Sequence, residues 1–476
     1  MRIPEVDPGE ARSRLEWASY GLARAHPELS AAHPTDRRQR RTFLGIAAAI
    51  IVSIVVMPIV TLTFLVVLAT AGYVAGVGYR VALFRRSLNS DSVITVTDAD
   101  ARAVPDHELP VYTVLVPAYH EPEVVGGLLG SLSRMEYPHD KLDVKLLLEA
   151  DDDETIAAVA VLGDVPFLEV ILVPPSEPRT KPKALNYGLC SARGDLVTIF
   201  DAEDDPDPLQ LRRAVVALDR AGSYVACVQA KLSYANAEQN VITKWFTAEY
   251  TMWFTLFLPG LSDLGAPIPL GGTSNHFRRE VLDRLGGWDP FNVTEDADLG
   301  LRIARSGLEV RVLDSVTLEE ANSDFVNWAK QRSRWYKGYL QTWLVHVREP
   351  RRTVRELGWW PFLQMNLFVG GTPFLALLNP IFWMLTVVWF VGQPLIIRDV
   401  FPAPVYYAGI VAWAFGNFAV VYMMVVSVRL SRRPELLLTA LIAPVYWIMM
   451  SIAATKAAVQ LVVAPSFWEK TTHGLS

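Results

Sequence analysis

The chain has 476 residues, of which 51% are hydrophobic, and a formal net charge of −6 at pH 7. This length exceeds one typical domain, and the hydrophobic residues gather towards both ends, which predicts a polar central domain between membrane-length segments. Clusters of arginine lie at the edges of the apolar stretches, so they indicate membrane topology and exclude a nucleic-acid partner. The clusters comprise Arg37, Arg38, Arg40 and Arg41, then Arg85 and Arg86, and finally Arg429, Arg432 and Arg433. The only two cysteines, Cys190 and Cys227, predict no disulfide framework.

The first 86 residues predict a polar segment followed by a membrane hairpin. Residues 1–42 carry proline, arginine and acidic residues before any apolar run, unlike a cleaved signal peptide, and are assigned to the cytosol. Residues 43–86 are largely apolar, are interrupted at Pro58 and have room for two spans of about 20 residues each. Because arginine flanks both ends, the hairpin should return to the cytoplasm and leave the central domain inside the cell.

Residues 87–350 predict a mostly parallel sheet covered by helices, which is a Rossmann-like α/β fold. Four short runs read as buried strands, namely 111–116, 144–148, 170–173 and 196–200. Polar and acidic residues follow most of these runs, at the strand ends where such sheets bind ligands. Two aromatic stretches are too broken to cross a bilayer and are expected to seat this domain against the headgroups as interface helices. They are residues 245–261 and 328–343.

Residues 351–430 predict a second membrane hairpin, with spans at 362–392 and 404–428 joined by a short outer loop. The next apolar run, 436–463, is long enough to span but carries a lysine and is followed by a polar tail. We therefore expect residues 431–476 to form a helix in the membrane interface and a C-terminal segment. If the run did cross the membrane, the tail would lie outside.

An acidic motif, Asp201-Ala202-Glu203-Asp204, follows the last of the predicted strands. If the chain stays extended, Asp201 and Glu203 point to the same side. Two carboxylates on one side can hold Mg²⁺ or Mn²⁺ against a nucleotide diphosphate. The alternative is an ordinary solvated turn, which the position after a buried strand disfavours.

A second acidic motif, Thr294-Glu295-Asp296, leads into a helical pattern. One interpretation is helix capping by Thr294 or by one of the carboxylates. The other is a base that takes a proton from an acceptor hydroxyl. In that case cations such as Arg334 or Lys183 would neutralise a departing diphosphate.

Gln331, Arg334 and Trp335 lie at positions i, i+3 and i+4, so an amide, a guanidinium and a flat aromatic ring share one helix face. Such a face can hold both a sugar and a diphosphate. The alternative is an amphipathic surface helix whose arginines reach towards headgroups.

Two smaller motifs lie between these. Thr180-Lys181-Pro182-Lys183-Ala184-Leu185-Asn186 is a basic turn entering a helix, with a solvated loop as the alternative. Gly271-Gly272 predicts a close approach of the backbone, which glycine permits. The nearby His276 is interpreted as a hydrogen-bonding residue and not as a metal ligand.

In this order the motifs resemble the processive family 2 glycosyltransferases, the group of cellulose, chitin and hyaluronan synthases, over roughly residues 43–475. The resemblance implies a GT-A-like glycosyltransferase domain inserted between transmembrane hairpins. It implies that Asp201 and a partner bind the metal-diphosphate, and that Asp296, with Glu295 beside it, is the general base. It further implies substrate contacts at Tyr119, Glu121, Glu149, Lys183 and Asn186, and at Gln331, Arg334 and Trp335.

The chain departs from the family pattern in three places. The usual Asp-x-Asp appears here as Asp201-Ala202-Glu203-Asp204, so the second metal ligand could be Glu203 or Asp204. The first acidic motif lacks its following glycines, which leaves Glu149 and Asp151 as alternatives for the contact to the nucleobase. The segment 467–473 is similar in position to the gating loop but differs in sequence. From it, substrate contacts are expected at Lys470, Thr471 and His473.

The resemblance implies an inverting, processive β-glycosyltransferase of the inner membrane with a cytoplasmic catalytic domain. It would use a UDP-hexose donor, with UDP-glucose favoured, and Mg²⁺ or Mn²⁺, and would extend a growing polysaccharide of β-glucan type and translocate it across the lipid bilayer. Since four spans make a thin channel wall, a homo-oligomer or partner subunit is expected to complete it. Two alternatives stay open: a non-processive transferase that glycosylates a lipid, and a non-catalytic scaffold or export subunit.

Overall fold

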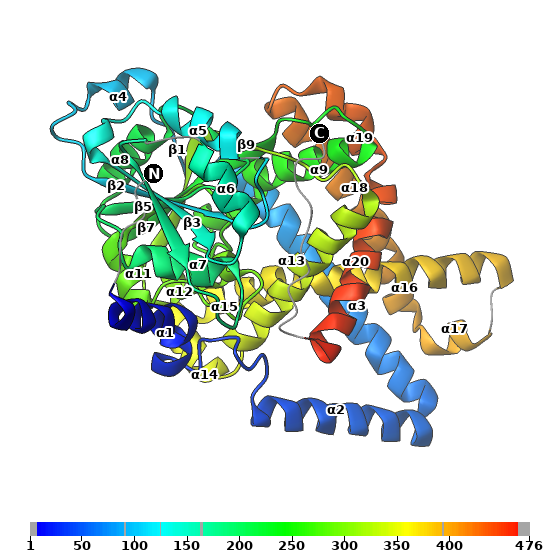
Figure 1. Cartoon of the computed structure of the whole chain (residues 1–476). Helices are drawn as coiled ribbons and strands as arrows, with labels where there is room; N and C mark the ends of the chain where they lie inside the picture. Colours follow the sequence, from blue (N-terminus) through cyan, green and yellow to red (C-terminus); the bar gives the residue numbers. More distant parts are fainter. Residues whose placement is uncertain (1–6, 90–91, 124, 162–164, 393–394, 465–476) are drawn as a thin grey trace.

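The computed structural model describes residues 7–89, 92–123, 125–161, 165–392 and 395–464, so the expected contacts at Lys470, Thr471 and His473 lie outside the described residues. Within the described chain, one sheet of nine strands carries helices on both faces (Figure 1). The strand order is β1-β9-β7-β8-β5-β2-β3-β4, with β6 paired to β9. The strands are β1 (Val93–Ile94), β2 (Tyr112–Ala118), β3 (Leu142–Glu149), β4 (Leu168–Val173), β5 (Leu196–Ile199), β6 (Asp205–Pro206), β7 (Val225–Tyr234), β8 (Asn275–Arg278) and β9 (Glu309–Glu319).

The four predicted strands correspond to β2, β3, β4 and β5, which pair in parallel with one another. Strand β8 is antiparallel to both β5 and β7, which makes the sheet mixed. Side chains alternate between the two faces as expected for a strand. Val114 and Val116 enter one hydrophobic core, whereas Leu115 enters the other. The predicted α/β architecture is therefore present, and both faces of its central strands are buried.

Helices cover the two faces of the sheet differently. One core is formed with α4 (Asp98–Ala103), α5 (Val125–Ser133), α6 (Asp153–Val161) and α8 (Gln210–Ala221). The other core includes α1 (Pro8–Ala25), α7 (Lys181–Leu189), α9 (Val241–Met252), α10 (Leu258–Asp263), α11 (Arg279–Leu285) and α12 (Glu295–Arg305). This second core continues without a break to Leu83 and Val428 in long apolar helices. The sheet and the apolar helices thus share one hydrophobic core.

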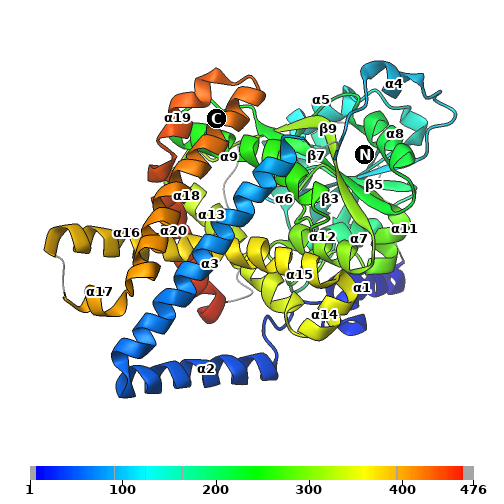
Figure 2. The same cartoon turned by 180° about the vertical axis from the view of Figure 1, so that it is seen from behind.

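Five helical segments of the described chain are long and apolar enough to cross a membrane. They are α2 (Arg37–Val56), α3 (Pro58–Ser87), Trp359–Gly392, α18 (Ala403–Leu430) and α20 (Ala443–Val463). Figures 1 and 2 show α3, α18 and α20 close together beside the sheet, whereas α2 and α16 (Gly371–Gly392) project away from it. Many large apolar side chains on these helices are exposed, which is typical of surfaces that contact lipid. The interface position predicted for residues 436–463 stays a prediction.

The remaining helices are short. They are α14 (Pro350–Leu357), α15 (Trp359–Met365), α17 (Leu395–Val400) between α16 and α18, α19 (Leu437–Leu441), and the single turns η1 (His139–Lys141), which precedes β3, and η4 (Pro434–Leu436). Two π-helical segments, η2 (Trp253–Phe257) and η3 (Asn366–Gly370), interrupt otherwise α-helical stretches. The rings of Trp253 and Phe368 from these segments lie 5.4 Å apart between centroids. Such π segments occur frequently at functional sites.

Helix α13 (Phe325–His346) joins the sheet to the apolar helices. It starts at Asp324, whose carboxylate accepts a hydrogen bond from the Asn327 backbone N–H at 2.9 Å and so caps the helix. It packs against α20 on one side and α12 on another. The stretch predicted at 328–343 is therefore one continuous helix.

Candidate active site

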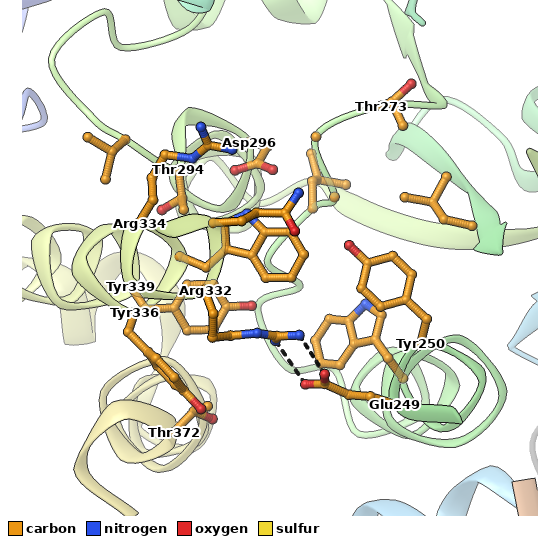
Figure 3. Close-up of a pocket in the computed structure, with 18 of the residues that line it drawn as sticks. Glu249, Tyr250, Thr273, Thr294, Asp296, Arg332, Arg334, Tyr336, Tyr339 and Thr372 are labelled. Atoms are coloured by element: carbon orange, nitrogen blue, oxygen red, sulfur yellow. Dashed lines mark hydrogen bonds and ion pairs between the residues drawn. The ribbon is translucent and has the colours of Figure 1, made fainter. Parts of the chain in front are cut away.

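A single cavity of about 710 Å³ runs from the carboxyl ends of β2, β3 and β5 to the apolar helices. Most of the site residues predicted from the sequence line it. They are Tyr119, Glu121, Glu149, Asp201, Glu203, Glu295, Asp296, Gln331, Arg334 and Trp335. In the close-up of Figure 3, Asp296, Thr294 and Arg334 lie near one end, and Tyr336 and Thr372 lie at the other. This volume is typical of pockets for nucleotide-sized ligands.

The acidic motif after β5 divides between the cavity and the protein interior. Asp201 and Glu203 line the cavity, whereas Asp204 is buried and its Oδ2 accepts a hydrogen bond from the Asp201 N–H at 2.8 Å. Burial, together with the carboxylates of Asp201 and Glu203, raises the pKa of Asp204 well above its ordinary value. The Asp204 side chain thus stabilises the turn from inside the protein. Of the two alternatives for a second metal ligand, Glu203 is therefore the one that reaches the cavity.

A cation does lie beside this motif, but it is Lys181 and not the predicted Lys183. The Lys181 ammonium donates to the Asp201 carboxylate and to the carbonyl oxygen of Gly272, the latter at 2.9 Å. Burial alone would lower the pKa of Lys181, but the carboxylates of Asp201 and Glu295 outweigh that effect and raise it. Lys181 is therefore a permanent positive charge between the two acidic motifs.

The structure places Lys183 and Asn186 behind the cavity wall. Lys183 is fully buried and forms an ion pair with Glu149 at 2.8 Å. The Asn186 amide donates to the carbonyl oxygen of Trp288 at 2.8 Å and to that of Ala18 in α1 at 3.2 Å. The basic turn is thus not a solvated loop. In these positions both side chains can support the site without touching a substrate in the cavity.

Arg179 is a cavity residue that the sequence analysis did not single out. Its guanidinium donates to Asp151 at 2.6 Å and to the Tyr119 hydroxyl at 3.1 Å. Asp151 does not line the cavity, whereas its alternative Glu149 does. Arg179 directly precedes the basic turn that begins at Thr180 and contains Lys181. The proximity of Arg179 to this turn is the feature of the sequence that could have identified it.

The second acidic motif lies at the start of α12. The side chain of Thr294 makes no capping hydrogen bond in the described chain, so the prediction that Thr294 caps this helix is wrong. Asp298 on the same turn has a structural role, because it accepts from Arg302 at 2.7 Å and pairs with His346 at 3.0 Å. Glu295 and Asp296 instead reach the cavity. Burial raises the pKa of Asp296 to about 6, and burial with the neighbouring Asp296 raises that of Glu295 to about 8.

The close backbone approach predicted at the glycine pair is found beside this motif. A Cβ on Gly272 would stand 3.5 Å from Asp296 Oδ2 and 3.9 Å from the Lys181 ammonium. A side chain there would fill the space between the metal-type acids and the candidate base. His276 hydrogen-bonds to Tyr112 at 2.7 Å and to Gln210 at 3.2 Å, in agreement with its interpretation as a hydrogen-bonding residue.

Gln331, Arg334 and Trp335 share the cavity-facing side of α13, as the helical spacing predicts. The intervening Arg332 is buried and forms an ion pair with Glu249 through two hydrogen bonds of 2.9 and 2.6 Å (Figure 3). Its guanidinium carbon lies 4.6 Å from the centroid of the Trp335 ring, which also stacks on Tyr250 at 6.0 Å. The surface-helix alternative does not describe this arrangement, since the arginine behind the ring is held inside the protein.

The far half of the cavity lies among the apolar helices. Its lining is mostly apolar and comprises Val77, Leu375, Ala376, Val420, Met424 and Met450, among which a few polar side chains are placed. The polar members include Arg80 of α3, Thr372 and Asn379 of α16, and Asn417 of α18. A molecule in this half would contact hydrocarbon and a small number of hydrogen-bonding groups.

Comparison with known proteins shows which family the central domain is similar to. Residues 110–338 match the family described as "Glycosyltransferase like family 2". The beta-monoglucosyldiacylglycerol synthase of Trichormus variabilis is 30% identical over 278 residues, which cover 56% of this chain and 58% of that protein. A probable glucomannan 4-beta-mannosyltransferase of Arabidopsis thaliana is 26% identical over 259 residues, which cover 52% of this chain and 46% of that protein. The chain spans about half the length of the curated relatives it matches.

Among solved structures, a mannosyltransferase from Pyrobaculum calidifontis in complex with GDP-Man and Mn²⁺ has a TM-score of 0.50 and 22% identity, and the match covers 84% of this chain and 99% of that one. This likeness concerns the fold, and it confirms the GT-A-like expectation. The narrower resemblance to processive cellulose, chitin and hyaluronan synthases stays a prediction. Residues 110–338 are therefore similar to glycosyltransferase family 2, and the sheet domain has a mixed α/β, GT-A-like fold.

Proposed function

We propose that the protein is a metal-dependent, inverting hexosyltransferase that moves a sugar from a nucleotide donor to a hydroxyl of an acceptor that enters from the membrane. The observation that carries this proposal is the single cavity that connects Asp201, Glu203 and Asp296 with the apolar helices. A soluble acceptor would need no such connection. The catalytic domain would then face the cytoplasm, with the lipid bilayer around α2, α3, α16 and α18, as the arginine clusters predict.

The donor half offers a partial metal site. Among the described residues, no group of three metal-ligating side chains gathers, so protein ligands would be the two carboxylates of Asp201 and Glu203. That set fits Mg²⁺ or Mn²⁺, which prefer oxygen ligands and commonly take the rest from substrate phosphates and water. When bound, the ion would stabilise the negative charge of the departing diphosphate. Lys181 would add a fixed positive charge on the same side.

Asp296 is the group we assign as general base. It lines the cavity near Arg334, and its raised pKa makes it a stronger proton acceptor than an exposed aspartate. Glu295, with the higher pKa, would remain protonated near neutral pH and spare Asp296 the repulsion of a second full charge. The acceptor hydroxyl would lie between Asp296 and the donor sugar, next to Gly272, whose missing side chain leaves Asp296 accessible.

Trp335 would bind the acceptor. Its ring lines the cavity and is held in place by the adjacent Arg332, so it offers a fixed apolar surface on which a sugar or a glycerol backbone can pack. Gln331 and Arg334 on the same face would hydrogen-bond the acceptor and the diphosphate. Gln331 is itself oriented, because its Oε1 accepts from the Asn322 amide at 2.9 Å.

We favour a lipid acceptor because the far half of the cavity includes aliphatic side chains such as Val77, Leu375 and Val420, which suit acyl chains better than sugar hydroxyls. One relative is named a beta-monoglucosyldiacylglycerol synthase, which agrees with such an acceptor. The processive β-glucan synthase remains the second candidate, because Trp253, Trp335 and Trp447 also line the cavity and could stack successive sugars. That candidate retains the expected homo-oligomer or partner subunit around a channel.

The test is a donor screen on the purified full-length chain in nanodiscs, with Mg²⁺ or Mn²⁺ and a panel of labelled UDP- and GDP-hexoses that includes UDP-glucose. Nucleotide release and product mass are measured together. A single glycosylated lipid supports the proposal, and a ladder of products favours the processive candidate. Asp296→Asn should strongly reduce both nucleotide release and product formation, whereas Asp219→Asn, which changes an exposed aspartate on α8, should change neither. If no donor gives nucleotide release, the proposal that the protein is an enzyme is refuted and the non-catalytic scaffold alternative is favoured.

A further inference from the structure

Arg80 differs from the other arginines near the end of α3. Arg85 and Arg86 are exposed, and Arg86 faces Asp263 at 3.8 Å. Arg80 lies five residues closer to the middle of the helix, which corresponds to roughly 7 Å along its axis. It is half-buried and lines the cavity. Measured from the arginines that flank the span, this depth is where lipid headgroups meet the acyl chains.

The Arg80 guanidinium has little protein to pair with. One of its N–H groups donates to the Thr372 hydroxyl at 3.4 Å, and its ionisable neighbours are the phenols of Tyr73 and Tyr336. In the part of the chain that the structure describes, no carboxylate lies within ion-pair distance of it. A guanidinium has five N–H donors, and a half-buried cation is unfavourable unless an anion accompanies it. The site therefore favours a negatively charged ligand.

The surroundings of Arg80 indicate what kind of molecule carries that charge. Thr372, Leu375, Ala376 and Asn379 of α16 all line the cavity at helical spacing, over roughly 10 Å of the helix. Asn379 Oδ1 is buried and, among the described residues, has no hydrogen-bond donor. The ligand next to Arg80 thus has a negative group, an apolar part and room for a hydroxyl. An anionic lipid has this composition, and a nucleotide does not.

We propose that Arg80 binds the phosphate of an anionic lipid, and that this phospholipid is the acceptor. The inference rests on the proposed function, because it specifies the acceptor that enters from the membrane. The donor diphosphate belongs to the opposite end of the cavity, where Lys181 and Asp201 lie. Figure 3 places Thr372, the partner of Arg80, beside Tyr336 and away from Asp296.

Binding is tested on the detergent-purified full chain with short-chain phosphatidylglycerol, dioctanoylglycerol, inorganic phosphate and UDP, by thermal shift and native mass spectrometry. Arg80→Gln should weaken phosphatidylglycerol binding roughly 10- to 100-fold, the range for hydrogen bonds to a charged group. Arg80→Lys should lose less, and Arg85→Gln, the matched control on the same helix, should lose nothing. UDP affinity should be the same in all variants, which also verifies that each is folded.

Three results would overturn the inference. They are equal binding of phosphatidylglycerol by Arg80→Gln and wild type, an equal loss in Arg85→Gln, and binding of inorganic phosphate as tight as that of the lipid. Transfer assays separate this inference from the proposed function. If the wild-type protein glycosylates dioctanoylglycerol but not phosphatidylglycerol, the proposed function stands and the proposal of a phospholipid acceptor is refuted. Wild-type protein that glycosylates no lipid would refute both the lipid acceptor and the phospholipid assignment.

Discussion

The ion pair between Glu249 and Arg332 offers a quantitative test of how the proposed acceptor surface is held in place. Arg332 is 7% exposed and lies between the Trp335 ring and the Glu249 carboxylate. Removing one partner of a buried ion pair typically costs about 3–5 kcal/mol, because the other charge stays buried without compensation. In Glu249→Gln the amide oxygen can still accept one hydrogen bond, and the Tyr446 hydroxyl remains 3.1 Å from the guanidinium. We therefore expect the lower end, about 3 kcal/mol of unfolding free energy.

The assay is a double-mutant cycle on detergent-purified protein, with denaturant unfolding followed by tryptophan fluorescence. Arg332→Met should be destabilising by a similar amount, since it leaves the Glu249 carboxylate without its cation and with only the Tyr446 hydroxyl as a donor. The double variant Glu249→Gln/Arg332→Met should lose less than either single variant, because both charges of the pair disappear together. Both single variants should also raise the KM for the acceptor more than that for the donor. Strictly additive losses, or wild-type stability of Glu249→Gln, would refute the reasoning.

Three further predictions concern the donor and base groups. Asp296→Asn should lower kcat by about 10²- to 10⁴-fold, as expected for loss of a general base, while UDP affinity measured by calorimetry stays unchanged. Since the pKa of Asp296 is raised to about 6 and the base must be ionised, kcat should fall as pH drops through about 6 and level off above it; a flat profile from pH 5 to 8 would contradict the assignment. Glu203→Gln should raise the Mn²⁺ concentration for half-maximal activity about tenfold or more, whereas Asp204→Asn should mainly lower thermal stability; the reverse order would make Asp204 the metal ligand.

The sequence predicted the central strands well because each is a short run of β-branched and apolar residues bounded by turns. Strands β2 to β5 follow this pattern, and their polar successors lie at one edge of the sheet, as the parallel arrangement requires. The antiparallel insertion of β8 was not predictable in this way, because strand direction depends on long-range pairing. The packing of α1 against α7 also escaped the pattern, since the contact of Asn186 with Ala18 joins residues 168 positions apart.

The candidate site was predictable where spacing alone determines which side chains meet. Gln331, Arg334 and Trp335 fulfil this condition, because helical geometry places them on one face. Spacing alone does not determine which of Lys181 and Lys183 reaches the cavity, because this depends on how the turn before α7 packs against the sheet. Lys183 points to Glu149 in the interior and Lys181 to Asp201 at the cavity. Two lysines in one short motif therefore have different surroundings that no local rule distinguishes.

The two halves of the cavity depend on different parts of the molecule. The donor half is fixed by strand ends, so Asp201 and Asp296 have positions that the sheet and α12 determine. The acceptor half depends on α13, where Arg332 connects Glu249 of α9 with the Tyr446 hydroxyl of α20. Tyr446 also donates to Glu249 at 2.8 Å, so the three side chains hold three helices together next to Trp335. The position of the acceptor surface is thus set by the packing of an apolar helix that is long enough to span the membrane. A change in that packing would alter acceptor binding before it altered the donor site.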